Sequence, residues 1–271
     1  MTAQKNVANR RARAADLISL PVVGAGPSAA ASTNSIIQNA TFYNNPSGVL
    51  NYLNWTQHGL VTPVRYQGQC GTCWAFASAA AIESQYVLKT GVLVSLSPQN
   101  LVDCAPYLTA SQNNKCIGNT CEYGYEYVYA NGIQTEQSYP YTSGNGNVGS
   151  CYYDPSKSVT NVNYYAYLPE NDEMAMVKAI FNIGPITAAL YAGNSGFQFY
   201  QSGIYHEPEC SEQVNHAVLI VGYGTDQTAG DYYIVKNSYG LNWGESGFFR
   251  ISRNLNMCGC GSSAMYTTIA H

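Results

Sequence analysis

The amino-acid sequence predicts an α+β fold that consists of a mainly helical lobe followed by a mainly β lobe. In the first half of the chain, residues 73–90 have the composition of a helix. In the second half, short apolar runs separated by glycines are typical of strands. A chain of 271 residues is long enough to bury a large core, as one two-lobed domain or as two small ones.

Two segments carry a helical pattern. Residues 73–90 are rich in alanine, with larger apolar residues between, and Gly91 ends the run. Residues 171–183 begin with Asp172 and Glu173, which favour the first turn of a helix, and a Gly-Pro pair follows them. We therefore expect one long helix in each half of the chain.

Four strands are expected in the second half, each a short apolar run bounded by glycines or polar residues. They are residues 186–191, 217–223, 232–236 and 247–251. The folded body is expected to start near Asn51, because residues 1–50 lack any long apolar period.

The first 50 residues also differ in charge. They carry Lys5, Arg10, Arg11 and Arg13 against the single acid Asp16, whereas the whole chain has a net charge of −4. The body is therefore acidic, which argues against nucleic acid and anionic membranes as partners. The sequence contains no uninterrupted run of about 18 apolar residues, so we expect no transmembrane helix.

Residues 17–31 follow this basic patch and end in small residues, as in a signal peptide. Pro21 and Pro27 interrupt the apolar stretch, so a disordered leader rich in alanine, serine and asparagine is the alternative. The sequence leaves both interpretations open.

The chain has nine cysteines, and six of them in disulfides plus one reactive thiol would suit an oxidising compartment. Two close pairs, Cys70 with Cys73 and Cys258 with Cys260, also resemble zinc ligands. No histidine stands at zinc-finger spacing, so we expect no metal site. A redox site at Cys70 and Cys73 is a further alternative, but the surrounding βαβ pattern is missing.

Three short segments contain the residue types that nucleophilic catalysis needs. They are residues 67–76 (QGQCGTCWAF), 215–218 (NHAV) and 236–240 (KNSYG). Cys73 stands where the first helix should begin, and the N–H groups and dipole of a helix N-terminus stabilise a thiolate. A protonated His216 beside it would add a full positive charge, so Cys73 is the candidate nucleophile and His216 the candidate base.

Two further residues complete this candidate site. The amide oxygen of Asn237 can accept a hydrogen bond from the imidazole and fix its direction. Gln67 is expected to donate to the oxyanion together with the backbone N–H of Cys73. Such a donor contributes about 2.7–4 kcal/mol to transition-state stabilisation.

The order and spacing of these residues resemble the papain-like cysteine proteases. In that family a C-G-[SA]-C-[WY] segment precedes His and Asn by about 130–150 residues. Residues 70–74 depart from it only at Thr72. The resemblance extends over residues 52–271 and is closest to the cathepsin L branch, since the adjacent histidines of cathepsin B exopeptidases are absent. Further matching segments are residues 97–104 (SPQNLVDC), 138–141 (SYPY), 184–186 (GPI), 203–205 (GIY), 221–224 (VGYG) and 243–247 (WGESG).

This resemblance implies a papain-like two-lobed fold. The helical left lobe is expected over residues 51–160, the β-barrel-like right lobe over residues 161–271, and the active-site cleft between them. The family's zymogens carry a longer helical prosegment, so residues 1–50 are interpreted as a truncated prosegment or another kind of leader.

The resemblance also implies the activity of a cysteine endopeptidase, which acts through a thiolate–imidazolium pair and an acyl-enzyme thioester without a metal or cofactor. Expected partners are protein or peptide substrates and inhibitors of the cystatin type. The expected state is a monomer, either in a lysosomal or endosomal compartment or secreted. The alternative is a catalytically weak relative that serves as a binding or structural protein.

The residues implied for substrate binding are less regular. Gly118 and Asn119 correspond to a glycine pair that binds extended peptide, and Asn119 departs from it, although asparagine tolerates a positive φ. Asn215 is expected to contact substrate next to the base, and Trp243 to lie on the leaving-group side. The pocket for the second residue before the scissile bond is expected to be small and mainly apolar, with the lining residues Cys121, Ala189, Val214, Ala217 and Ser263.

The resemblance further implies three disulfides, which are Cys70–Cys116, Cys104–Cys151 and Cys210–Cys258. Cys121 and Cys260 are left over, and they could bridge each other or stay free. The family has Trp two residues after the orienting Asn, where this chain has Tyr239. Tyrosine can still cover the bond between His216 and Asn237, but it brings a hydroxyl.

Overall fold

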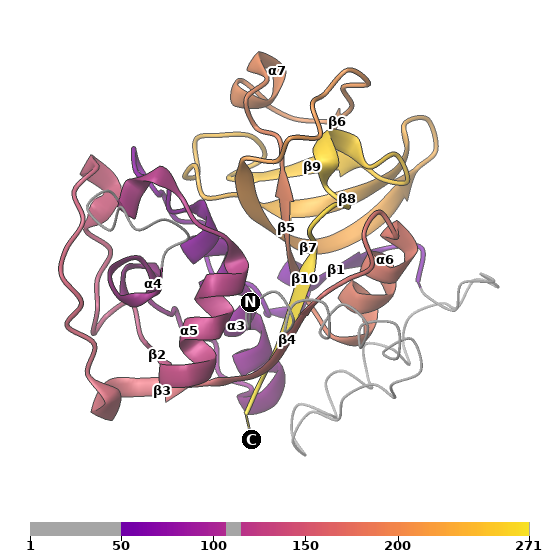
Figure 1. Ribbon diagram of the computed structural model, residues 1–271. Coiled ribbons are helices and arrows are strands. Elements are labelled where there is room, and N and C mark those ends of the chain that lie inside the picture. Colours follow the sequence, from indigo (N-terminus) through magenta and orange to yellow (C-terminus); the bar gives the residue numbers. More distant parts are fainter. Residues whose placement is uncertain (1–49, 107–114, 271) are drawn as a thin grey trace, which may run out of the picture.

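The computed structural model describes residues 50–106 and 115–270. Within these ranges the chain forms a helical lobe and a β lobe that lie side by side (Figure 1). The predicted two-lobed α+β fold is confirmed. Apart from Leu50, the expected leader over residues 1–50 lies outside the described residues.

The predicted long helix over residues 73–90 is α3, with the same bounds. The predicted second helix is α6, which starts at Glu173 because Asp172 is its N-cap and accepts a hydrogen bond from the N–H of Ala175 at 2.9 Å. The helices of the described residues are α3 (Cys73–Thr90), α4 (Pro98–Cys104), α5 (Cys121–Asn131), α6 (Glu173–Asn182) and α7 (Ser195–Gln198), with 3-10 turns at Trp55–His58, Lys115–Ile117, Ser143–Asn145, Pro155–Lys157 and Met257–Gly259.

The β lobe is built on one eight-stranded sheet with the order β4-β10-β5-β7-β8-β9-β6, and β1 pairs with β7 beside this path. All pairs in it are antiparallel except β6 with β9. Its strands are β1 (Leu53–Asn54), β4 (Val162–Tyr167), β5 (Ile186–Leu190), β6 (Ile204–Tyr205), β7 (His216–Asp226), β8 (Gly230–Lys236), β9 (Phe248–Ser252) and β10 (Met265–Ile269). A small second sheet pairs β2 (Ile133–Gln134) with β3 (Ser158–Thr160).

Helix α3 is the centre of the helical lobe. Every side chain from Cys73 to Gln85 is buried, which the small alanines and serines allow. A Cβ added to Gly124 of α5 would meet the Ser78 side chain at 2.7 Å, so α5 approaches α3 very closely. Gly91 ends the helix at φ 74°, a left-handed conformation that glycine adopts without strain.

Strand β7 separates the two hydrophobic cores. Successive side chains of a strand point to opposite faces. Ala217, Leu219 and Val221 therefore join the core around α3, whereas Val218 and Ile220 join the core of the β lobe. This single strand fixes the position of α3 relative to the sheet.

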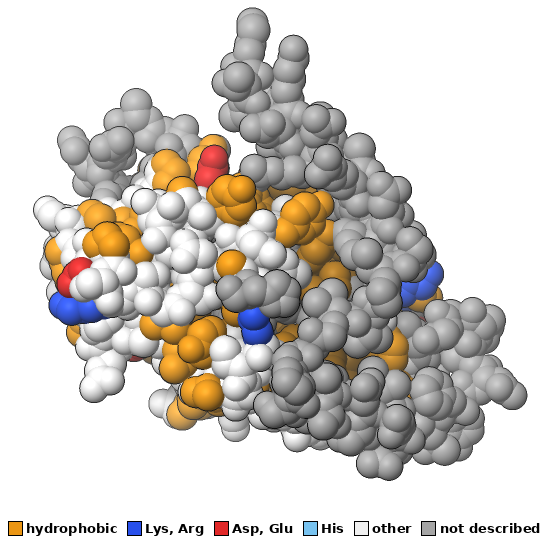
Figure 2. Space-filling view, turned by 90° about the horizontal axis from the view of Figure 1, so that it is seen from below, with side chains coloured by type: hydrophobic (Ala, Val, Ile, Leu, Met, Phe, Trp, Pro, Cys, Tyr) orange, Lys and Arg blue, Asp and Glu red, His pale blue; other side chains and the backbone are white. Residues whose placement is uncertain are grey.

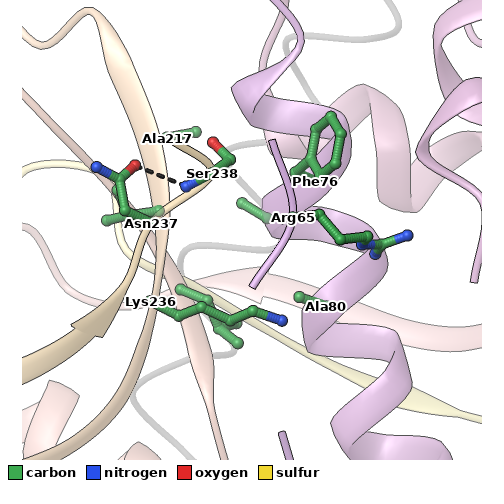
Figure 3. A pocket seen from close by; sticks show the side chains of 10 residues that line it. Arg65, Phe76, Ala80, Ala217, Lys236, Asn237 and Ser238 are labelled. Atoms are coloured by element: carbon green, nitrogen blue, oxygen red, sulfur yellow. Dashed lines mark hydrogen bonds between the residues drawn. The ribbon is translucent and has the colours of Figure 1, made fainter. Parts of the chain in front are cut away.

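A network of buried polar groups also joins the lobes. The Glu83 carboxylate on α3 is 1% exposed and accepts hydrogen bonds from Arg65 at 2.9 Å, from the N–H of Leu96 at 2.8 Å and from the hydroxyl of Thr62. At the end of β8, Lys236 extends toward α3 (Figure 3) and donates to Thr62 at 2.9 Å. Burial lowers the pKa of Lys236 to about 8. The charges of this network compensate one another inside the protein.

The surface carries few charges, in keeping with a charged-residue content of 10%. Among the described atoms of the face in Figure 2, apolar and uncharged polar side chains predominate. None of the helices in residues 50–106 and 115–270 has the length and apolarity to cross a membrane.

Replacing Glu83 with glutamine should lower the free energy of unfolding by about 3 kcal/mol, because breaking a buried ion pair leaves an uncompensated charge. Urea unfolding at pH 6 measures this effect. The control is Lys157→Gln, which removes an exposed partner of Asp154 and should leave stability unchanged. Equal stabilities for the two variants would show that the network does not hold the lobes together.

Candidate active site

Cys73 is the first residue of α3 and is 9% exposed. The preceding residue, Thr72, occupies the N-cap position, and its carbonyl accepts from the N–H groups of Ala75 and Phe76 at 2.9 and 3.2 Å. The first N–H groups of a helix have no partner within the helix. The sulfur of Cys73 therefore lies at the positive end of the helix dipole.

His216 is the first residue of β7 and is 5% exposed. Its Nε2 lies 2.8 Å from Oδ1 of Asn237, which follows β8. Because an amide oxygen only accepts, Nε2 is the donor, and Nδ1 is left to face the thiol. Oδ1 of Asn237 also accepts from the N–H of Ser238 at 2.8 Å, and this bond, drawn in Figure 3, holds the amide in place.

The pKa shifts of the two reacting groups follow from this geometry. Burial by itself raises the pKa of Cys73, but the charge and hydrogen bond of His216, together with hydrogen bonds from the backbone N–H groups of Ala217 and Trp74, outweigh it, so the pKa lies below its ordinary value. Burial by itself lowers the pKa of His216, but the charge of Cys73 and the bonds to Cys73 and Asn237 outweigh it, so the pKa is raised. The two shifts favour a thiolate–imidazolium pair.

Aromatic rings cover the imidazole. The ring of Tyr239 lies 4.8 Å from that of His216, and Trp243 meets Tyr239 edge-on at 5.4 Å. Burial, followed by the charge of Cys73, raises the pKa of Tyr239 to about 12, so its hydroxyl stays neutral. Tyr239 thus occupies the covering position that the sequence analysis gave it.

Gln67 is buried between the lobes. Its backbone N–H donates to Ser238 O at 2.9 Å, and its Oε1 accepts from the Ser238 hydroxyl at 2.6 Å. One N–H of its amide donates to Cys70 O at 3.0 Å, which leaves the second for an oxyanion. No role for Ser238 could be predicted from the sequence, because a serine in a loop carries no signal until the contact across the lobes is visible.

The segment that was expected to bind extended peptide lies against the cysteine motif. The N–H of Gly71 donates to Cys116 O at 2.9 Å, and Gly118 has φ 102°, where glycine is favoured. Asn119 is not among the described residues with positive φ, so its tolerance of that conformation is not used. Its side chain instead donates to Pro106 O at 2.9 Å.

Three of the five expected pocket residues have neighbours that relate them to this site. Ala189 and Ala217 face each other on β5 and β7, and Cys121, at the start of α5, lies in the same core as Ala217 and Cys73. Burial raises the pKa of Cys121 to about 12, so it is a neutral, mainly apolar group. Val214 is 37% exposed and stands two residues before β7. The fifth, Ser263, is partly buried, two residues before β10.

The other two residues expected to contact substrate are at least partly accessible. Asn215 precedes His216, and its Oδ1 accepts from the N–H of Ala192 at 2.8 Å. The indole N–H of Trp243 donates to Gln198 O at 3.0 Å, which ties it to α7. Asn215 therefore adjoins the base along the chain, and Trp243 is related to it through Tyr239, whose ring meets both.

The cysteines decide the alternatives that the sequence left open. The disulfides are Cys70–Cys116, Cys104–Cys151 and Cys210–Cys258, the pairs that the resemblance implies. Cys121 and Cys260 are free and buried, so they do not bridge each other. Because Cys70 and Cys258 are oxidised, neither cysteine pair is available as zinc ligands, and Cys70 cannot act as a redox partner of Cys73.

Comparison with known proteins agrees with this geometry. The model of the papain family of cysteine proteases matches residues 50–268. The chain belongs to this family. The resemblance that the sequence analysis drew from its motifs is confirmed.

Individual relatives are cathepsins. The chain is 45% identical over 220 residues to cathepsin L of Sarcophaga peregrina, a match that covers 80% of this chain and 63% of that protein. It is 42% identical to procathepsin L of Mus musculus, with 80% of this chain and 65% of the relative covered. The chain therefore spans a little less than two thirds of these relatives.

Two solved structures share the fold. Bromelain from Ananas comosus, in complex with the E64 inhibitor, superposes with a TM-score of 0.73 at 35% identity and covers 82% of this chain and all of its own. Digestive procathepsin L2 from the larval midgut of Tenebrio molitor gives a TM-score of 0.74 at 37% identity, with 87% of this chain and 71% of that chain covered.

The reactivity of Cys73 toward iodoacetamide should reveal the ion pair. Because its pKa is lowered, alkylation should persist well below the range of an ordinary thiol, and His216→Ala should move the profile to higher pH. Asn237→Ala removes a bond that raises the pKa of His216, so the imidazolium should be lost at lower pH than in the wild type.

The exposed His206 provides the control, since His206→Ala should leave the profile unchanged. Cys121 and Cys260 should not interfere, because burial raises the pKa of each to about 12. A profile that His216→Ala does not shift would contradict the pairing of Cys73 with His216.

Proposed function

We propose that this protein is a cysteine endopeptidase that hydrolyses peptide bonds through an acyl-enzyme thioester. The observation that carries the proposal is the convergence of Cys73, His216 and Asn237 at the junction of the lobes, with the imidazole fixed at 2.8 Å from the Asn237 amide. Family membership and the raised pKa of His216 support it. No ordinary structural role needs this set of groups in this arrangement.

In the proposed mechanism, the thiolate of Cys73 attacks the peptide carbonyl. The carbonyl oxygen becomes an oxyanion, which the second N–H of the Gln67 amide and the backbone N–H of Cys73 stabilise. His216 then gives its proton to the leaving amine as the C–N bond breaks, and a thioester remains. In the second half, His216 takes a proton from water, which attacks the thioester, and the acid product leaves as the thiolate is restored.

Asn237 and Tyr239 support this cycle without touching the reacting carbonyl. The Asn237 amide keeps the imidazole directed toward the thiol while its charge changes. A neutral amide does not compete with the thiolate for the positive charge of His216. Tyr239 covers the imidazole with its ring, which lies 4.8 Å away.

The substrate is proposed to be an extended protein or peptide that passes Gly118 and Asn119 and places one side chain in the pocket of Cys121, Ala189, Val214, Ala217 and Ser263. Trp243 and Asn215 would contact the substrate near the base. We also assign a mainly helical lobe to residues 51–160, apart from strand β1, which pairs with β7 of the β lobe, and a mainly β lobe to residues 161–271, with a leader before them.

Three disulfides suit an oxidising setting, so we place the protein in a lysosomal or endosomal compartment or outside the cell. We propose that the protein is a monomer. We also propose that inhibitors of the cystatin type can block it.

Cys73→Ala should abolish peptide hydrolysis and labelling by an epoxide probe of the E64 type, because the nucleophile is lost. Far-UV circular dichroism and the three disulfides should be unchanged. Cys260→Ala is the matched control, since this free thiol lies in the core of the β lobe, and it should retain both activities. Turnover by purified Cys73→Ala would overturn the proposed function.

A positional peptide library should show a preference for Leu, Val or Phe at the second residue before the cut. No acidic residue belongs to the proposed pocket, and each buried methylene contributes about 0.8 kcal/mol. Leu should therefore be favoured over Ala by roughly 10–200-fold in kcat/KM. A dominant preference for Arg would mean that these five residues do not form the pocket, and Ser263 would be the first to reconsider.

A further inference from the structure

The hydroxyl of Tyr141 connects the two segments from which the oxyanion donors come. It lies 2.6 Å from the carbonyl oxygen of Gln67 and 2.7 Å from Oγ1 of Thr72. A carbonyl oxygen only accepts, so Tyr141 donates to Gln67 and the Thr72 hydroxyl donates to Tyr141. The three groups form a directional chain of hydrogen bonds, in which each bond strengthens the next.

Contacts that do not involve its hydroxyl already hold Tyr141. Its ring meets Phe76 of α3 edge-on at 4.8 Å, and its backbone N–H donates to the Glu136 carboxylate at 2.8 Å. Glu136 pairs with Arg65 at 3.2 Å, and the Arg65 guanidinium lies over the Phe76 ring. The hydroxyl is thus presented at a fixed place, and burial raises its pKa, so it stays protonated.

The two ends of the chain carry the proposed oxyanion donors. Thr72 is fully buried and is the N-cap of α3, so its position sets that of the Cys73 N–H. Gln67 is held through its N–H and Oε1 by Ser238 of the β lobe. The hydroxyl of Tyr141 adds a hydrogen bond from the helical lobe to the carbonyl oxygen of Gln67.

The segment that follows Gln67 lies very close to the segment that follows Tyr141. A Cβ added to Gly68 would meet the carbonyl oxygen of Gly144 at 2.1 Å, and the same oxygen accepts from the N–H of Gln69 at 2.9 Å. Gly144, three residues after Tyr141, therefore lies against Gly68 and Gln69, the two residues after Gln67.

We propose that Tyr141 and Thr72 are positioning residues that hold the Gln67 amide and the Cys73 N–H at the separation that an oxyanion requires. This inference rests on the proposed peptidase function and adds the device that aligns its oxyanion donors. At position 72, where the family pattern has serine or alanine, threonine keeps the hydroxyl of serine, which alanine lacks. Tyr141, which ends the matching segment of residues 138–141, thereby gains a role in aligning the oxyanion donors.

The test compares Tyr141→Phe and Thr72→Val, which remove each hydroxyl with little change in shape, with Thr72→Ser, which keeps one. Net hydrogen-bond strengths predict a loss of kcat of about 3- to 10-fold in the first two variants, with KM within about twofold. Thr72→Ser should behave as the wild type. Because both hydroxyls belong to one chain, the double variant should lose little more than either single one.

Two further measurements separate positioning from a general structural effect. A peptide aldehyde forms a hemithioacetal with Cys73 and places its oxygen where the oxyanion develops, so its affinity should fall by the same factor as kcat. The rate of alkylation by iodoacetamide needs no oxyanion donor and should stay unchanged. Tyr129→Phe, at an exposed tyrosine of α5, controls for the loss of a hydroxyl elsewhere.

Full kcat and aldehyde affinity in both Tyr141→Phe and Thr72→Val would overturn this inference while leaving the peptidase function intact. A parallel fall of alkylation and kcat would also overturn it, because the change would then act on the nucleophile. A wild-type protein that neither hydrolyses peptides nor takes up the epoxide probe would overturn the proposed function itself, and this inference with it. If Tyr141→Phe is unstable, the contrast between Thr72→Val and Thr72→Ser decides alone.

Discussion

The charge interaction between Cys73 and His216 connects the two lobes, because Cys73 begins α3 and His216 begins β7. Neither group would be ionised in this way if the other lobe were displaced, since burial opposes the charge on both. The candidate site therefore depends on the packing of one helix against one strand. That packing uses the small side chains of α3 and alternate residues of β7.

A second set of contacts, made by buried polar side chains of both lobes, stabilises the same junction. Glu83 and Lys236 meet through Thr62 inside the protein, so the charged groups there compensate one another. Ser238 holds Gln67 from the β lobe, and Tyr141 holds it from the helical lobe. The groups proposed for nucleophilic attack and for oxyanion binding are thus carried by elements with little freedom to move, which is what electrostatic preorganisation requires.

Some elements gave no clear signal in the sequence. Helix α5 contains Gly124, four tyrosines and two glutamates along its length, so its period is weak, and its small glycine is explained only by the close approach of α3. Strands β4 and β10 were not predicted, because neither shows a strict alternation of apolar and polar residues, although both contain the tyrosines or threonines that strands favour. Both become strands because they pair with each other, and β10 also with β5. Pairing between distant segments is a tertiary property that local propensity does not encode.

The sequence by itself determined the family, the class of fold, the bounds of α3 and the identity of Cys73, His216, Asn237 and Gln67 as candidates, since their chemistry and spacing are local or depend on order along the chain. Only the tertiary structure decided that Cys121 and Cys260 stay apart, and that Ser238 and Tyr141 hold Gln67. These are contacts between segments that lie far apart in the sequence. Their hydrogen bonds depend on distances of a few ångströms, which are defined only once α3 and β7 have packed.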